Sequence, residues 1–68
     1  MRLRELRKER HKTQIRMAID LNMSQNTISR YETGEREPGL RDLIQIADYF
    51  GVSTDYLLER TENPEISR

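Results

Sequence analysis

The feature of this sequence that most constrains its fold is a pair of helix-start signals in its first half, Thr13 and Ser24. A Ser or Thr side chain at such a position accepts a hydrogen bond from a free backbone N–H in the first helical turn. Between them lies Asn22, a residue type that tolerates the left-handed backbone of a sharp corner. The pattern predicts two short helices, Gln14 to Leu21 and Gln25 to Thr33, joined by a tight turn.

Breaker residues divide the rest of the chain into three further helical segments, whose apolar residues recur at helical spacing. These segments are Arg2 to Arg10, Leu40 to Phe50, and a short helix capped by Ser53 that ends near Glu59. No alternating Val/Ile/Thr run or Asn-Gly hairpin turn is present. The sequence therefore predicts an all-α, compact five-helix bundle, in which helices 2 and 3 form a helix-turn-helix from Thr13 to Thr33.

The second half of the chain contains both the most apolar and the least apolar segments. The fourth predicted helix carries the most hydrophobic face, formed by Leu40, Leu43, Ile44, Ile46, Ala47 and Phe50. Residues 61–68 offer only Ile66 for burial, so we expect a flexible tail there. The predicted organisation is one domain, residues 1–60, followed by that tail.

Composition excludes several classes of function. Without cysteine, the chain has no disulfide, thiolate zinc site or cysteine nucleophile. His11 is the only histidine, and the acidic pair Glu35 and Glu37 lies in a solvated loop with no histidine or hydroxyl nearby, so we expect no enzyme, metal site, cofactor or small-molecule ligand. No apolar stretch approaches the ~18 residues of a membrane span, and no signal peptide is evident. The expected location is the cytoplasm, with no membrane contact.

The net charge of zero conceals a polarised chain. Residues 1–30 carry eight basic and three acidic side chains, a net +5, whereas residues 31–68 carry four basic and nine acidic ones, a net −5. Such a molecule can present one basic face to an anionic partner while its total charge vanishes. On charge alone, a purely solubilising role stays equally open.

Projection of the third helix at about 100° per residue separates two faces. One is polar and free of carboxylates, formed by Gln25, Asn26, Ser29, Arg30 and Thr33; the other holds Thr27, Ile28, Tyr31 and Glu32. Gln and Asn can pair with the major-groove edge of adenine, and Arg with that of guanine. The free amides at Thr13-Gln14 and Ser24-Gln25 suit phosphate groups. These features favour binding of double-stranded DNA over a face that merely meets water.

These residues resemble the Cro/repressor-type (XRE) helix-turn-helix family over about residues 2–59. The matching positions are Thr13, Gln14, Ala18, Met23, Ser24, Thr27 to Glu32, Gly34, Pro38, Leu40, Leu43, Ile46, Ala47, Phe50 to Ser53, Asp55, Leu57 and Leu58. The resemblance implies a lambda-repressor-like bundle that binds operator DNA, usually as a homodimer on a palindrome. It further implies a transcription regulator, most often a repressor.

The resemblance also implies roles for individual residues. The base-contacting positions are Ser24, Gln25, Asn26 and Arg30, the phosphate contacts are Thr13, Gln14 and Thr33, and a structural ion pair joins Arg7 to Glu32. The dimer surface is expected near Val52, Thr54, Tyr56 and Leu57. Two residues depart from the family pattern: Lys12 replaces an apolar residue, which predicts a looser or more exposed first corner, and Asn22 replaces the glycine of the turn. An antitoxin-type or protein-interaction module with the same fold is the alternative function.

Overall fold

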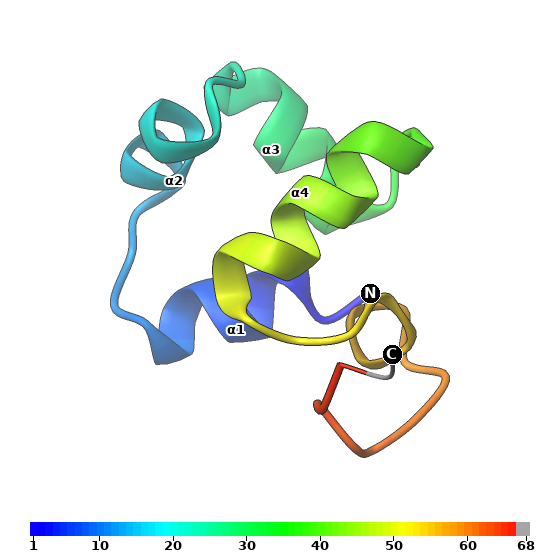
Figure 1. Ribbon diagram of the computed structural model, residues 1–68. Coiled ribbons are helices and arrows are strands. Elements are labelled where there is room, and N and C mark those ends of the chain that lie inside the picture. The colour runs from blue at the N-terminus through cyan, green and yellow to red at the C-terminus, as the bar shows by residue number, and fades with distance from the viewer. Residues whose placement is uncertain (67–68) are drawn as a thin grey trace.

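The computed structural model describes residues 1–66, which form five helices (Figure 1). They are α1 (Leu3–Glu9), α2 (Gln14–Leu21), α3 (Gln25–Thr33), α4 (Leu40–Phe50) and α5 (Thr54–Leu57). The described residues contain no strand, so the predicted all-α five-helix fold is confirmed. None of these helices has both the length and the apolar character needed to cross a membrane.

Local hydrogen bonds determine where α2 and α3 begin. Thr13 Oγ1 accepts the backbone N–H of Arg16 at 3.0 Å, and Ser24 Oγ accepts that of Thr27 at 3.1 Å. Between the two helices Asn22 adopts a left-handed backbone with φ 56°. The three signals in the sequence therefore produce the predicted corner, and both helices have the predicted bounds.

A single apolar core lies where the helices meet. It consists of Leu3, Leu6, Met17, Ala18, Leu21, Ile28, Tyr31, Ile46, Ala47, Phe50, Val52 and Leu57. Figure 1 shows α4 crossing the middle of the molecule, with α2 and α3 on one side and α1 and α5 on the other. Full burial of one large apolar side chain contributes about 1.5–3 kcal/mol, so these side chains fix α3 against the rest of the bundle.

Two apolar residues of α4 remain outside this core. Leu40 is 80% exposed and Ile44 52% exposed, although both belong to the most hydrophobic face that the sequence predicts. The buried stripe of α4 is centred on Ile46, Ala47 and Phe50. A helix that packs against the core on one side buries only one stripe, and the i, i+4 pair Leu40 and Ile44 lies beside it. The result is an exposed apolar pair on the surface of α4.

The fifth helix is shorter than the sequence predicts. It ends at Leu57 and not near Glu59, because Glu59 itself has a left-handed backbone with φ 65°. The predicted end therefore lies two residues beyond the observed one. Helix α1 differs by only one residue at each end, within the ordinary uncertainty of helix termini.

The beginning of the chain packs against α5. The backbone N–H of Arg2 donates to the carbonyl of Leu57 at 2.8 Å, and the Met1 ammonium group lies 3.4 Å from the Glu59 carboxylate. Arg2 also places its guanidinium carbon 4.4 Å from the centre of the Tyr56 ring. These contacts hold the N-terminus on the side of the molecule that carries α5 (Figure 1).

The segment after α5 folds back onto the corner between α4 and α5. The backbone N–H of Ser53 donates to the carbonyl of Pro64 at 2.9 Å, and Arg2 Nη2 donates to the carbonyl of Thr61 at 3.4 Å. These bonds attach part of the predicted tail to the domain, while its flexibility stays a prediction. Residues 67 and 68 of that tail lie outside the described residues.

Candidate nucleic-acid interface

The polar face of α3 is turned to solvent. The residues expected to contact bases, Ser24, Gln25, Asn26 and Arg30, are all exposed. On the opposite side Ile28 and Tyr31 are buried in the core. The structure therefore brings the four candidate side chains together on one accessible surface. Ser24 differs from the other three, because its hydroxyl both caps α3 and shares a hydrogen bond with Thr27 Oγ1 at 2.8 Å.

The starts of α2 and α3 offer free backbone N–H groups. The first amides of any helix have no carbonyl partner within the helix, and each cap satisfies only one of them. The helix dipole adds partial positive charge at the same place. Thr13, which is exposed, and Gln14, which is half-buried, therefore lie where a phosphate is favoured.

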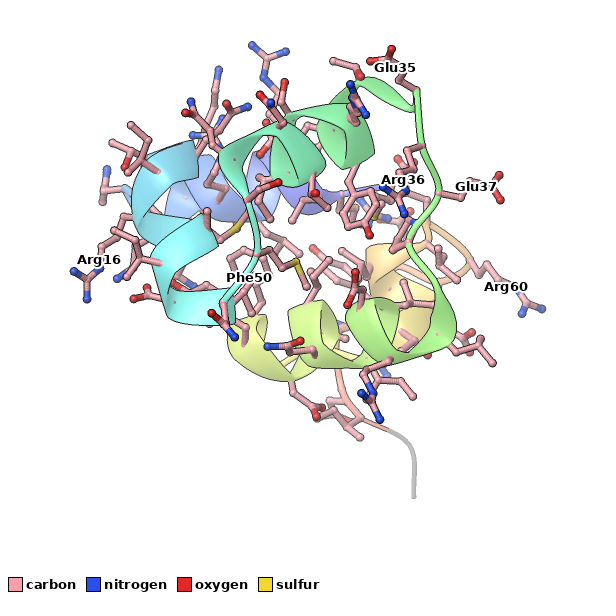
Figure 2. The ribbon with its side chains drawn as sticks, turned by 90° about the horizontal axis from the view of Figure 1, so that it is seen from above. Arg16, Glu35, Arg36, Glu37, Phe50 and Arg60 are labelled. Atoms are coloured by element: carbon pink, nitrogen blue, oxygen red, sulfur yellow. The ribbon has the colours of Figure 1, made fainter. Side chains whose placement is uncertain are left out.

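Thr33 and the loop after it form the far end of this surface. Thr33 is exposed, and its hydroxyl donates to the carbonyl of Arg30 at 3.2 Å and accepts the N–H of Glu35 at 3.4 Å. Figure 2 shows Glu35 and Glu37 pointing away from the body of the molecule beyond α3. These carboxylates would repel a phosphate, so Thr33 lies in a less favourable field than Thr13.

Arg7 and Glu32 form a two-pronged ion pair between α1 and α3. Arg7 Nε donates to Glu32 Oε2 at 2.6 Å and Arg7 Nη2 to Oε1 at 3.1 Å. The two side chains are 12% and 3% exposed. The structure thus brings together the two residues expected to pair, and it keeps the Glu32 carboxylate away from the exposed face of α3.

Gln14 also bonds to Glu32, a contact that the sequence did not predict. Its Nε2 donates to Glu32 Oε1 at 3.2 Å, so one carboxylate connects α1, α2 and α3. The only signal in the sequence is a Gln at the first position of α2, and nothing local distinguishes it from a side chain that points to solvent. The contact arises from how α2 packs against α3.

Internal ion pairs account for much of the basic charge in the first half of the chain. Arg2 pairs with Glu62, Arg7 with Glu32, and both Lys12 and Arg16 with Asp20. Lys12 is half-buried, its ammonium nitrogen 3.9 Å from the Asp20 carboxylate, so the corner that was expected to be loose has a polar contact across it. Among residues 1–66, the basic side chains in the first half of the chain that are exposed and take part in no ion pair are Arg4, Lys8, Arg10 and Arg30.

A buried tyrosine joins α3 to α4. Tyr31 donates its hydroxyl to Asp42 Oδ2 at 2.7 Å. Burial, and then the hydrogen bond to Asp42, raise the pKa of Tyr31 above its usual value of 10.0. The neutral phenol is therefore the form that holds the C-terminal end of α3 in place.

No three His, Cys, Asp or Glu side chains in the described part of the chain are grouped to hold a metal ion.

Two capped helices at a tight corner, with a polar, carboxylate-free face on the second, define the class of helix-turn-helix DNA-binding domains. A sequence model of the helix-turn-helix family matches residues 3–57. The chain belongs to this family, and the resemblance noted from its sequence is confirmed. Membership supports a DNA-binding regulator rather than an enzyme.

Several curated proteins are similar to this chain. The HTH-type transcriptional regulator ImmR of Bacillus subtilis is 39% identical over 61 residues, covering 90% of this chain and 48% of ImmR. The cryptic phage CTXphi transcriptional repressor RstR of Vibrio cholerae is 38% identical over 68 residues, covering 96% of this chain and 61% of RstR. An uncharacterized HTH-type transcriptional regulator of B. subtilis, YqaE, is 38% identical over 64 residues, covering 94% of this chain and 55% of YqaE. The chain spans about half the length of the curated relatives it matches. No solved structure matches it significantly.

Proposed function

We propose that this chain binds a specific sequence of double-stranded DNA with α3 in the major groove and regulates transcription, as a repressor that occupies its operator. The observation that carries the proposal is the exposed face of Ser24, Gln25, Asn26 and Arg30, from which the nearest carboxylate on the helix, Glu32, is turned away. A repressor role is further supported by similarity to a protein that is named a transcriptional repressor.

The proposed contacts are of two kinds. Gln25 and Asn26 contact adenine edges and Arg30 a guanine edge, which gives the sequence preference. Thr13, Gln14 and Thr33 contact phosphates on either side of the groove, which positions α3 without selecting a sequence. The Ser24 hydroxyl accepts the Thr27 N–H and shares a hydrogen bond with Thr27 Oγ1, so it contributes a groove contact through its one remaining donor or lone pair.

We also propose that the chain binds as a homodimer on a palindromic site. One helix contacts only a few base pairs, and two copies engage half-sites about 34 Å apart. Of the residues expected at the dimer surface, Val52 and Leu57 are buried within their own chain, and Thr54 and Tyr56 are half-buried. The exposed pair Leu40 and Ile44 on α4 supplies apolar area that those residues do not.

Selection of duplexes from a random-sequence pool, followed by footprinting, tests the proposal. We expect enrichment of an inverted repeat whose half-site centres are about one helical turn apart. Protection of one half-site in a non-palindromic sequence would contradict the dimer. A pool that shows no enrichment would contradict sequence-specific binding altogether.

A further inference from the structure

The Gln14 side-chain amide has a defined orientation because it shares the Glu32 carboxylate with Arg7. Glu32 Oε1 accepts from Gln14 Nε2 at 3.2 Å and from Arg7 Nη2 at 3.1 Å, while Oε2 accepts from Arg7 Nε at 2.6 Å. A carboxylate only accepts hydrogen bonds, so the amide nitrogen of Gln14, and not its oxygen, faces Glu32. One N–H of Gln14 is used in this way, and the second remains available to another acceptor.

The cluster that holds this amide is itself fixed. The Glu32 side chain is 3% exposed and that of Arg7 is 12% exposed, so little water competes for their hydrogen bonds. Arg7 Nη1 also donates to the carbonyl of Lys12 at 3.0 Å, which holds the chain immediately before the cap of α2. Gln14 is therefore attached to an anchored group at the place where α2 begins.

The charge of this cluster is compatible with a nearby phosphate. An isolated carboxylate at the start of α2 would repel DNA, but the Arg7 guanidinium pairs with Glu32 and cancels its formal charge. Glu32 can therefore orient Gln14 without adding net negative charge to the surface.

From this geometry we infer that Glu32 is a positioning residue for the DNA contact of Gln14, an inference that rests on the proposed function. A free Gln side chain samples several rotamers and loses that freedom when it binds a phosphate. Glu32 orients the amide before DNA arrives, so the contact forms without this loss. Glu32 thus affects DNA affinity through Gln14, in addition to joining α3 to α1.

A double-mutant cycle on DNA affinity tests this role. The variants are Gln14→Ala, Glu32→Gln and the double variant, titrated by fluorescence anisotropy into the labelled duplex that selection enriches. Circular dichroism in the same buffer gives the folded fraction used to correct each affinity. We expect Gln14→Ala to weaken binding about tenfold. Glu32→Gln should weaken binding in the same direction, and the double variant should bind no more weakly than Gln14→Ala alone, because the two residues act as one.

Gln25 supplies the matched control. It has the same side chain as Gln14 but lies on the exposed face of α3, so Gln25→Ala and Glu32→Gln should have independent, multiplying effects. Multiplying effects of Gln14→Ala and Glu32→Gln would overturn the inference while leaving the proposed function intact. A parent protein that binds no duplex would overturn both.

A spectroscopic measurement on the parent protein covers the case in which Glu32→Gln does not fold. The two side-chain amide protons of Gln14 should have separate chemical shifts outside the range of a free Gln, and added duplex should shift the proton that does not bind Glu32. Two protons at free-Gln positions in the protein without DNA would overturn the inference.

Discussion

Loss of the Glu32 carboxylate should destabilise the domain strongly, even without DNA. In Glu32→Ala, three donors on Arg7 and Gln14 lose their acceptor, and the guanidinium of Arg7, whose side chain is only 12% exposed, is left without its counter-charge. Removal of one partner from a buried ion pair costs about 3–5 kcal/mol. A domain of this size has a free energy of unfolding of about 3–10 kcal/mol at ~0.05–0.15 kcal/mol per residue, so the change removes a large part of it.

Thermal melting followed by circular dichroism measures this effect. At about 4–8 °C for each kcal/mol, the melting temperature of Glu32→Ala should fall by about 12 °C or more. Gln25→Ala is the control, because Gln25 is exposed on the same helix and its truncation should change stability by less than about 0.5 kcal/mol. If Glu32→Ala melts within a few degrees of the parent but no longer binds DNA, then Glu32 is a contact residue, and the orientation of α3 described above is wrong.

Four further predictions concern binding, pH and assembly. Arg30→Ala should weaken binding to the selected duplex by about 1–3 kcal/mol and reduce the sequence preference at one base position. Thr33→Ala should weaken binding to the selected and to a scrambled duplex by the same factor. If Arg30→Ala weakened binding to the two duplexes equally, a base contact of Arg30 would be contradicted. The logarithm of the DNA affinity should fall linearly with the logarithm of the salt concentration. Equal affinities at two salt concentrations would contradict the phosphate contacts. Because the pKa of Tyr31 is raised, its contribution to stability is complete below pH 10 and is lost as pH rises through the raised value. Tyr31→Phe should therefore make the melting temperature fall less steeply at alkaline pH. Parallel curves of melting temperature against pH for the parent and the variant would contradict this. Ile44→Asp should shift sedimentation toward the monomer, and an unchanged mass would place the dimer surface elsewhere.

Features determined by a few neighbouring residues could be predicted from the sequence. Thr13 and Ser24 each bond to an amide three residues away, and Asn22 needs only its own backbone tolerance to form the corner. The bounds of α2 and α3 follow from these local interactions. The two faces of α3 follow in turn from helical periodicity, because Ile28 and Tyr31 are the residues that the core can bury.

Features that depend on how the helices pack could not be predicted in this way. The bond from Gln14 to Glu32 joins residues 18 positions apart and exists only because α2 and α3 meet at that angle. The exposure of Leu40 depends on which elements cover α4, and an apolar residue type does not reveal that. Glu59 has a left-handed backbone although Glu has no special preference for that conformation, so the sequence does not indicate it. The individual DNA contacts stay predictions until a complex is tested.

Both ends of the described chain lie against α5, and this determines how the domain can be tethered. Met1 and the segment around Pro64 are held near α5, on the far side of α4 from the corner between α2 and α3 (Figure 1). A surface linker attached at either end would therefore leave the exposed face of α3 pointing outward. Attachment after Ile66 is preferable, because acylation of the Met1 amine would abolish its pairing with Glu59. An immobilised chain attached in this way would present its polar helix to DNA in solution.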